Sequence, residues 1–344
     1  MKFLPDQVVT RLQTEMQRPD LSGMRYHALK FLGHGGMGTV WLAEDSVLHR
    51  SVALKILPAE SSSTDLAARL MQEAVILARL EHPGIVPVHD AGTLPDGRTF
   101  YCMKYVEGQT LDRHMDELPL RQRLQLLQRI AEPLAFAHAR GIIHRDLKPG
   151  NIMVGAFGEV LIMDWGLAKV IAKAVSSLPK TFAPENAAIA RTEEDSRSQD
   201  FSQPVVRSAI TAHGTVLGTP GYMAPEQERG DVGLIDQRTD VFGLGSILQY
   251  MMRDQRGAAS IESAPRQLRA ICQKAMAAEM AARYASVQEL ASDVGKYLEG
   301  MPVSAYHENI LERTVRLVNR NRVAVVLILA YLLMRVVFIL FSRR

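Results

Sequence analysis

The chain has 344 residues, enough for two or three compact regions with a sizeable buried core, which excludes a small disulfide-stapled protein. Lys and Arg number 40 against 37 Asp and Glu, and the two signs are interleaved along the chain, so we expect no nucleic-acid partner. The two cysteines, Cys102 and Cys272, are too few for a disulfide framework or a zinc site and fit a reducing cytosol.

The early part of the chain is predicted to form a small antiparallel sheet after an N-terminal extension over 1–25. Asp6 and Glu15 lie where a signal peptide would be apolar, so we expect no export signal there. Apolar residues at helical spacing predict one helix over 63–80. Short segments bounded by Gly, Pro and Asp predict the strands, at 29–32, 39–43, 51–56, 85–89 and 99–105.

The chain from Leu120 to Leu298 is predicted to be mainly helical. Apolar spacing from Leu120 predicts a helix that ends at Gly141. Residues 176–210 are rich in Ser, Thr and mixed charges, which predicts a long loop. Strongly apolar or periodic stretches predict three further helices, over 240–252, 265–278 and 286–298.

The C-terminal region is predicted to attach the chain to a membrane. Residues 299–322 are basic and amphipathic, and we interpret them as a juxtamembrane segment. Residues 323–341 are apolar except for Arg335, which predicts a transmembrane helix; the alternative is a buried core helix. More arginines precede this run than follow it, so we expect a single-pass protein of the cytoplasmic (inner) membrane whose preceding domain faces the cytoplasm.

A glycine-rich stretch lies between the first two predicted strands. Gly33, Gly35, Gly36 and Gly38 lack side chains, so their backbone N–H groups can close over phosphate oxygens. In dinucleotide-binding folds the third glycine of such a motif opens a helix, whereas here a β-rich segment follows. A hairpin turn without a ligand remains the alternative for this motif alone.

Charged and polar residues of the kinds that bind phosphates and metal ions follow the glycine-rich stretch along the chain. Lys55 ends the third predicted strand, and a carboxylate on the next helix, Glu73, could hold it against phosphates. Further along, Asp146, Asn151 and Asp164 flank an apolar hairpin. Phosphoryl transfer needs positioning, charge neutralisation by metal and a carboxylate that orients the attacking hydroxyl, and these residue types supply those parts.

The ordered motifs resemble those of a bacterial eukaryotic-like (Hanks-type) serine/threonine protein kinase. The resemblance covers 26–298 and includes the segments 142–151, 164–166 and 218–226. It implies an α+β, bilobal protein-kinase-like fold: a small antiparallel β N-lobe with one helix (26–105) and a larger helical C-lobe (106–298). The stretch 176–210 would then be an insertion in the activation loop, and the transmembrane helix would follow.

The resemblance also implies roles for single residues. Lys55 would bind the α- and β-phosphates of ATP and pair with Glu73, while Asp146 would orient the substrate hydroxyl and Lys148 would steady the γ-phosphate. Asn151 and Asp164 would hold Mg2+, with Mn2+ as an alternative. The implied ATP-binding set is Gly33, Gly35, Gly36, Gly38, Val40, Ala53, Lys55, Met103, Lys104, Tyr105 and Val106.

Structural and regulatory residues are implied in the same way. Glu226 and Arg283 would form a buried ion pair, and Asp240 would support the C-lobe. Arg145 would receive a phosphate on the activation loop, and the candidate phosphorylation sites are Thr211 and Thr215. We expect autophosphorylation in trans, which would require a transient homodimer.

Three departures from the family pattern bear on activity. Trp165 replaces the usual Phe after Asp164, Lys104 replaces an acidic hinge residue, and only residues 253–264 stand where a longer segment and helix usually help to dock substrate. The leading hypothesis is an active, membrane-anchored kinase of protein Ser and Thr hydroxyls. The alternative is a nucleotide-binding pseudokinase or scaffold; a small-molecule kinase is disfavoured because 218–226 resembles a peptide-docking platform.

Overall fold

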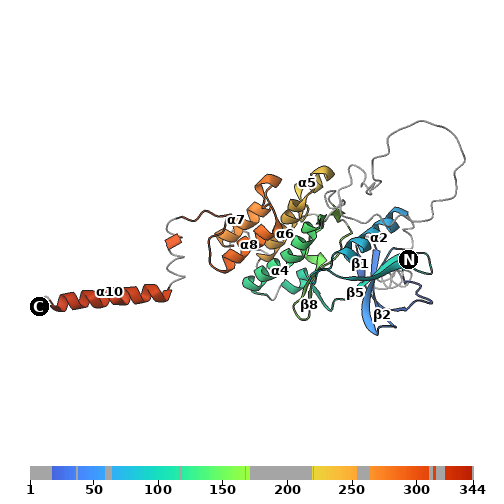
Figure 1. Cartoon of the computed structure of the whole chain (residues 1–344), viewed down its shortest axis with the longest axis horizontal. Helices are drawn as coiled ribbons and strands as arrows, with labels where there is room; N and C mark the ends of the chain where they lie inside the picture. Colours follow the sequence, from blue (N-terminus) through green and yellow to red (C-terminus); the bar gives the residue numbers. More distant parts are fainter. Residues whose placement is uncertain are drawn as a thin grey trace, which may run out of the picture.

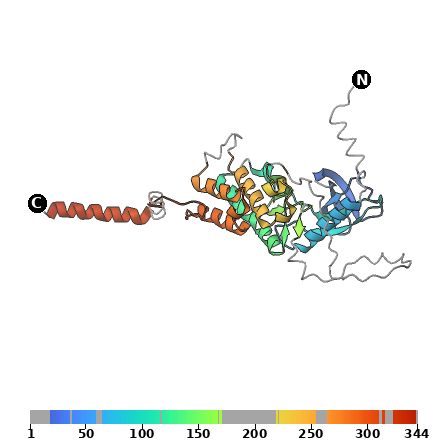
Figure 2. The same cartoon turned by 90° about the horizontal axis from the view of Figure 1, so that it is seen from above.

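The computed structural model describes residues 18–35, 38–58, 64–115, 118–166, 168–170, 219, 221–253, 264–309, 313–314 and 322–342. These residues form two lobes, a sheet-rich N-lobe and a helical C-lobe, with one long C-terminal helix that stands apart from both (Figures 1 and 2). The bilobal fold predicted from the sequence is therefore confirmed.

The N-lobe is built on one five-stranded antiparallel sheet with the strand order β1-β2-β3-β5-β4. Helix α2 (Thr64–Arg79) packs against β4 and β5 and confirms the predicted helix. The strands are β1 (Tyr26–Gly35), β2 (Gly38–Asp45), β3 (Arg50–Ile56), β4 (Val88–Thr93) and β5 (Thr99–Lys104).

The fourth strand differs from the predicted range 85–89, because β4 begins at Val88. The residues before it contact a strand of the C-lobe. Ile85 forms a parallel bridge with Ile162 of the C-lobe. Ile162 also donates its N–H to the carbonyl of Gly84 at 2.9 Å. The apolar character of 85–89 therefore reflects burial at the junction of the lobes, which a strand pattern cannot distinguish from membership of the sheet.

The alternation of side chains in the sheet separates its two faces. Leu54 and Cys102 belong to a buried cluster on one face, whereas Tyr101 belongs to the cluster that includes α2. Lys55 lies opposite Tyr101 in the β3–β5 register. Because successive side chains of a strand point to opposite faces, this register directs the lysine toward α2 and the interior between the lobes.

The C-lobe is a set of helices around one apolar core, and its four long helices confirm those expected from the sequence. Short two- and three-stranded sheets, β10-β7 and β6-β8-β9, lie on the side that faces the N-lobe. The helices are α3 (Leu111–His114), α4 (Leu120–Ala139), α5 (Pro225–Glu228), α6 (Gln237–Met251), α7 (Arg266–Ala275) and α8 (Val287–Leu298), with 3-10 turns η2 (Pro149–Asn151), η4 (Val232–Leu234) and η6 (Met280–Ala282). The short strands are β6 (Gly108–Thr110), β7 (Ile142–Ile143), β8 (Ile152–Gly155), β9 (Val160–Ile162) and β10 (Lys169–Val170).

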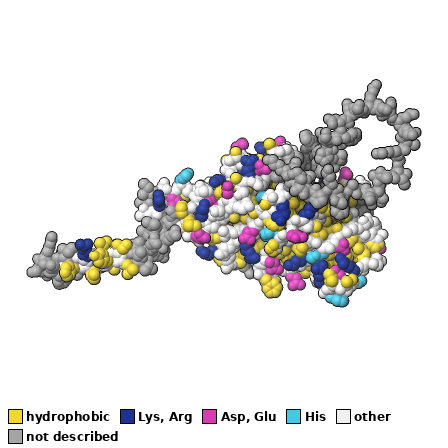
Figure 3. All heavy atoms as spheres, in the orientation of Figure 1, with side chains coloured by type: hydrophobic (Ala, Val, Ile, Leu, Met, Phe, Trp, Pro, Cys, Tyr) yellow, Lys and Arg dark blue, Asp and Glu magenta, His cyan; other side chains and the backbone are white. Residues whose placement is uncertain are grey.

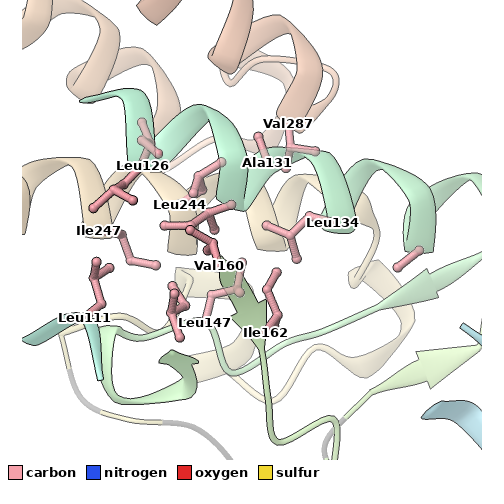
Figure 4. Packing of buried hydrophobic residues seen from close by; sticks show 14 of the residues in the cluster. Leu111, Leu126, Ala131, Leu134, Leu147, Val160, Ile162, Leu244, Ile247 and Val287 are labelled. Atoms are coloured by element: carbon pink, nitrogen blue, oxygen red, sulfur yellow. The ribbon is translucent and has the colours of Figure 1, made fainter. Parts of the chain in front are cut away.

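The core of the C-lobe lies where α4, α6 and the short sheet meet. Figure 4 shows Leu134 of α4, Leu244 of α6 and Ile162 of β9 directed into the same apolar region. Full burial of each such side chain contributes about 1.5 to 3 kcal/mol. The same cluster continues through Trp165 to Leu70 of α2, so the core links the two lobes and fixes the segments that lie between them.

The C-terminal helix α10 (Arg322–Ser342) confirms a helix where the sequence predicts one. Its described apolar side chains, between 326 and 338, are exposed and gather along the helix in Figure 3. Within the described part of the chain, however, no helix combines the length and apolar character needed to cross a membrane. The structure therefore does not confirm the predicted transmembrane helix over 323–341, nor does it bury this helix in a core.

Candidate active site

The glycine-rich stretch forms the tip of the β1–β2 hairpin. Gly33 pairs with Val40, and Gly35 with Gly38, while Gly36 lies outside the described residues. At Gly38 a Cβ atom would lie 2.3 Å from the carbonyl oxygen of Ile56, so a side chain there would force β2 away from β3. Gly38 therefore allows the close approach of β2 to β3 beside the glycine-rich turn.

Lys55, Glu73 and Asp164 form one buried ionic cluster. The Lys55 Nζ lies 2.8 and 2.9 Å from the two carboxylate oxygens of Glu73 and 2.9 Å from Asp164 Oδ1. This arrangement confirms the predicted Lys55–Glu73 pair and adds Asp164 to it. The cluster joins β3, α2 and the segment after β9, so it connects both lobes.

The pKa values of this cluster follow from one ammonium that serves two carboxylates. Burial alone would lower the pKa of Lys55, but the facing carboxylates of Glu73 and Asp164 raise it above its usual value. Burial raises the pKa of Glu73, and Lys55 opposes this effect without cancelling it. Burial would also raise the pKa of Asp164, but Lys55 outweighs it and lowers that pKa. Lys55 therefore stays protonated within the cluster.

The predicted adenine region is apolar and lies beside the segment that connects the lobes. Ala53 pairs with Met103 across β3 and β5, and Val106 is buried in a small cluster next to it. The sequence analysis missed two members of this region, Met153 of β8 and Met163 after β9, which pack against that cluster. Three flexible thioether side chains thus line one apolar wall that can adapt to a flat heterocycle.

Three polar side chains surround the carboxylate of Asp146, which lies in the catalytic loop 142–151. Lys148 Nζ lies 2.9 Å from Asp146 Oδ2, and Asn151 donates to the same oxygen at 3.1 Å. Thr219 donates its hydroxyl to Asp146 Oδ1 at 3.2 Å and accepts from Lys148 at 2.8 Å. These contacts hold Asp146 as an oriented carboxylate.

Asp240 supports the backbone of the catalytic loop from below. Its two carboxylate oxygens each accept a backbone N–H at 2.9 Å, one from His144 and one from Arg145, and His138 lies 2.7 Å from it. Burial would raise the pKa of Asp240, but these partners lower it. Arg145 adopts a φ of 73°, which is strained for a residue with a side chain. The buried carboxylate holds this strained turn in place.

The predicted ion pair of the C-lobe is present and fully buried. Arg283 donates to both carboxylate oxygens of Glu226 at 2.8 Å, and neither side chain is exposed. Thr239 also donates to Glu226, at 2.9 Å. This bidentate contact joins α5 to the segment between η6 and α8.

The regulatory residues are described only in part. The Nε of Arg145 is buried and has no hydrogen-bond partner among the described residues. Thr211 and Thr215 lie outside the described residues. Their predicted role stays a prediction.

The donor set fits magnesium bound together with a nucleotide. Asn151 turns its amide nitrogen toward Asp146 and its oxygen away, and Asp164 contributes a carboxylate; both are oxygen ligands that Mg2+ prefers. No group of three His, Cys, Asp or Glu side chains in the described part of the chain could hold a metal by itself. The site therefore suits a cation that takes its other ligands from phosphates and water.

Sequence reasoning missed the side chains that position the catalytic ones. Tyr101 donates to Glu73 Oε1 at 2.9 Å, and Gln227 donates to the carbonyl of Arg145 at 2.7 Å. Thr219 was part of a recognised segment, but its contact with Asp146 was not predicted. No spacing rule identifies such partners, because they come from distant segments that only the folded chain brings together.

Comparisons with known proteins agree with this geometry. Residues 26–331 match the family model described as "Protein kinase domain". A serine/threonine-protein kinase PknD from Chlamydia felis is 35% identical over 316 residues, which cover 81% of this chain and 31% of that protein. The PknD of Protochlamydia amoebophila is 32% identical, over 80% of this chain and 30% of that protein. The chain thus spans less than a third of the length of these relatives.

A likeness to solved structures supports the fold. The crystal structure of the Mycobacterium tuberculosis PknI kinase domain matches with a TM-score of 0.53 and 23% identity, over 79% of this chain and 96% of that one. At this identity the likeness concerns the fold alone.

Proposed function

The chain belongs to the protein kinase family, in its bacterial Hanks-type serine/threonine branch, and on that premise we propose that it transfers the γ-phosphate of ATP to Ser and Thr hydroxyls of proteins. The observation that carries the proposal is the set of contacts around Asp146, in which Lys148, Asn151 and Thr219 hold one carboxylate ready to accept a proton.

In the proposed reaction, Asp146 accepts the hydrogen bond of the substrate hydroxyl and orients its oxygen toward the γ-phosphorus. Lys148 neutralises charge that develops on the transferred group, and Lys55 does so for the α- and β-phosphates. Glu73 keeps Lys55 in place from α2. The γ-phosphoryl group is transferred from ATP to the hydroxyl oxygen, ADP is the leaving group, and the hydroxyl proton passes to Asp146.

Asn151 and Asp164 would hold Mg2+, which supplies charge neutralisation at the phosphates when bound. The β1–β2 hairpin would cover the phosphates with backbone N–H groups, and the apolar wall around Met103 would receive adenine. The close approach of β2 to β3 at Gly38 and the three methionines support this assignment.

The test is transfer of labelled phosphate from Mg-ATP by the full chain, to itself and to a generic basic protein. Asp146→Asn should reduce transfer at least about 100-fold, because a positioned acid–base group contributes about 10²- to 10⁴-fold. Asp231→Asn is the control, because this carboxylate lies in an exposed pair with Arg229. Equal label in wild type and Asp146→Asn would refute the assignment, and nucleotide binding without transfer would favour a pseudokinase.

We also propose regulation by autophosphorylation in trans. The unpartnered, buried Nε of Arg145 supports a role in binding a phosphate, and Thr211 and Thr215 precede the segment that carries Thr219. Phosphopeptide mapping of the active chain should locate phosphate in that stretch, at a rate that rises with protein concentration. Active protein without phosphate there would contradict this proposal.

For localisation we propose attachment to the cytoplasmic (inner) membrane through the C-terminal region, with the kinase domain in the cytoplasm. The apolar sequence of 323–341 and the basic residues before it support this. A chain ending at Arg322 should leave the membrane fraction. If it stays there after a high-salt wash, another part of the chain or a partner holds it.

A further inference from the structure

Tyr101 is a buried tyrosine whose hydroxyl points at a residue of the candidate active site. It lies in β5 directly opposite Lys55 of β3, and its side chain is 1% exposed. The hydroxyl donates to Glu73 Oε1 at 2.9 Å. The Lys55 Nζ lies 5.7 Å from the centre of the Tyr101 ring. The phenol therefore contacts both members of the Lys55–Glu73 pair.

The carboxylate of Glu73 depends on few partners. Among the described residues its hydrogen bonds come from Lys55 and Tyr101 only. Lys55 also contacts Asp164 at 2.9 Å, and in the proposed reaction it must turn part of its hydrogen-bonding capacity to phosphate oxygens. An ammonium has three donors, so each phosphate contact reduces what is left for Glu73.

A buried carboxylate without enough donors would favour an outward movement of α2. Glu73 is 1% exposed, and burying an unpaired charge costs free energy that local rearrangement relieves. Tyr101 is fixed by the sheet, because β5 pairs with β3 on one side and β4 on the other. Its hydroxyl can therefore hold Glu73 while the lysine serves the nucleotide.

We propose that Tyr101 is a positioning residue that keeps Glu73, and with it α2 and Lys55, in the arrangement needed for phosphoryl transfer. The inference rests on the proposed kinase function and extends it to a residue outside the recognised motifs. Burial raises the pKa of Tyr101 well above 10, so the hydroxyl remains a donor at all relevant pH values.

The experiment compares Tyr101→Phe with Tyr26→Phe in the full chain. Tyr26 is the matched control: it is equally buried in the same lobe, and its hydroxyl donates to a carboxylate, Asp90, at 2.8 Å, away from Lys55 and Glu73. Because a hydrogen bond to a charged group contributes enough to change an equilibrium about tenfold, Tyr101→Phe should lower kcat/KM for ATP by about tenfold. Tyr26→Phe should change it less than about twofold.

Two further readouts separate positioning from loss of stability. The groups that face Glu73 are Lys55 from β3, Tyr101 from β5 and Asp164 from the segment after β9. Losing the phenol donor raises the pKa of Glu73, so the acidic limb of the kcat/KM profile should move to higher pH in Tyr101→Phe and not in Tyr26→Phe. In a Glu73→Gln background, Tyr101→Phe should cost much less than in wild type.

The outcomes distinguish this inference from the proposed function. A wild-type chain that transfers no phosphate refutes the proposed function. A wild-type chain that does transfer phosphate, with Tyr101→Phe equal to Tyr26→Phe in rate and pH profile, overturns the role of Tyr101 alone. Equal losses of Tyr101→Phe in the wild-type and Glu73→Gln backgrounds also overturn it, because the tyrosine would then act without Glu73.

Discussion

Asp293 of α8 holds the segment that follows the last helix of the C-lobe. Its buried carboxylate accepts from the backbone N–H of Ser304 at 2.9 Å and of Ala305 at 3.1 Å, and from the Ser304 hydroxyl at 2.6 Å. Tyr284 donates its hydroxyl at 2.9 Å, and Lys296 lies 3.1 Å away. Replacing Asp293 by Asn should loosen this segment, because the amide nitrogen cannot accept the bonds made to the oxygen that it replaces.

The magnitude follows from the pKa of Asp293. Burial alone would raise this pKa, but the donors, Ser304 foremost, lower it from 3.8 to about 2. A tenfold change in proton affinity corresponds to about 1.4 kcal/mol, so the ionised carboxylate contributes about 2 kcal/mol to the free energy of unfolding at neutral pH. Since the folded pKa lies below the unfolded one, this contribution is complete above about pH 4 and disappears as the pH falls toward about 2.

Urea unfolding of wild type and Asp293→Asn at pH 7 and at pH values down to 3 measures the effect. We expect a loss of about 2 kcal/mol at pH 7 that shrinks below pH 4, and faster hydrogen exchange at the amides of Ser304 and Ala305. Asp231→Asn, which changes an exposed carboxylate, should cost less than about 0.5 kcal/mol. A loss that stays constant with pH, or that equals the control, would show that the charge of Asp293 does not hold the segment.

Two further substitutions test the core contacts. Arg283→Leu leaves the buried carboxylate of Glu226 without its bidentate partner, so we expect the free energy of unfolding in urea to fall by about 3 to 5 kcal/mol. Arg238→Leu is the control, because Arg238 lies in a half-exposed pair with Asp236 and its loss should cost less than about 1 kcal/mol. Similar losses in the two variants would contradict the argument. Trp165→Phe removes volume from a fully buried site and also removes the 3.4 Å hydrogen bond from Nε1 to the carbonyl of Ile162. We expect thermal unfolding to show a loss of stability of about 1 to 2 kcal/mol, while the affinity for ADP stays within about twofold. A large loss of affinity would mean that the indole positions Asp164.

The sequence predicted most of the fold because the relevant signals are local. Short segments bounded by Gly, Pro and Asp formed strands, and strongly apolar or helically spaced stretches formed α2, α4, α6, α7 and α8. The exception, 85–89, carries the same apolar signal for another reason: Ile85 pairs with Ile162 across the lobes. A local pattern records burial, and it does not record which partner buries the residue.

The residues of the candidate site also differ in whether the sequence could identify them. Lys55, Glu73, Asp146, Asn151 and Asp164 were identified because their order along the chain is itself the signal, and the structure brings them together. Their supporting residues could not be identified in this way. Tyr101, Gln227 and Met163 carry ordinary side chains in a strand, a helix and a connecting segment, and their roles depend on distances between elements.

The C-terminal end of α6, before the short connection to α7, is stabilised by a side chain from α4. Helix α6 leaves unpaired carbonyl groups at its C-terminal end, and a following helix could have covered them. Here Arg123 of α4 donates to the carbonyls of Met251 at 3.1 Å and Arg253 at 2.9 Å, so a side chain from a neighbouring helix satisfies this end. A cation at a helix C-terminus also interacts favourably with the helix dipole. Because α6 carries Asp240, the contact from Arg123 links α4 to the helix that supports the backbone of His144 and Arg145. We therefore expect changes in the connection between α6 and α7 to alter substrate selection before they alter the positions of Asp146 and Lys148.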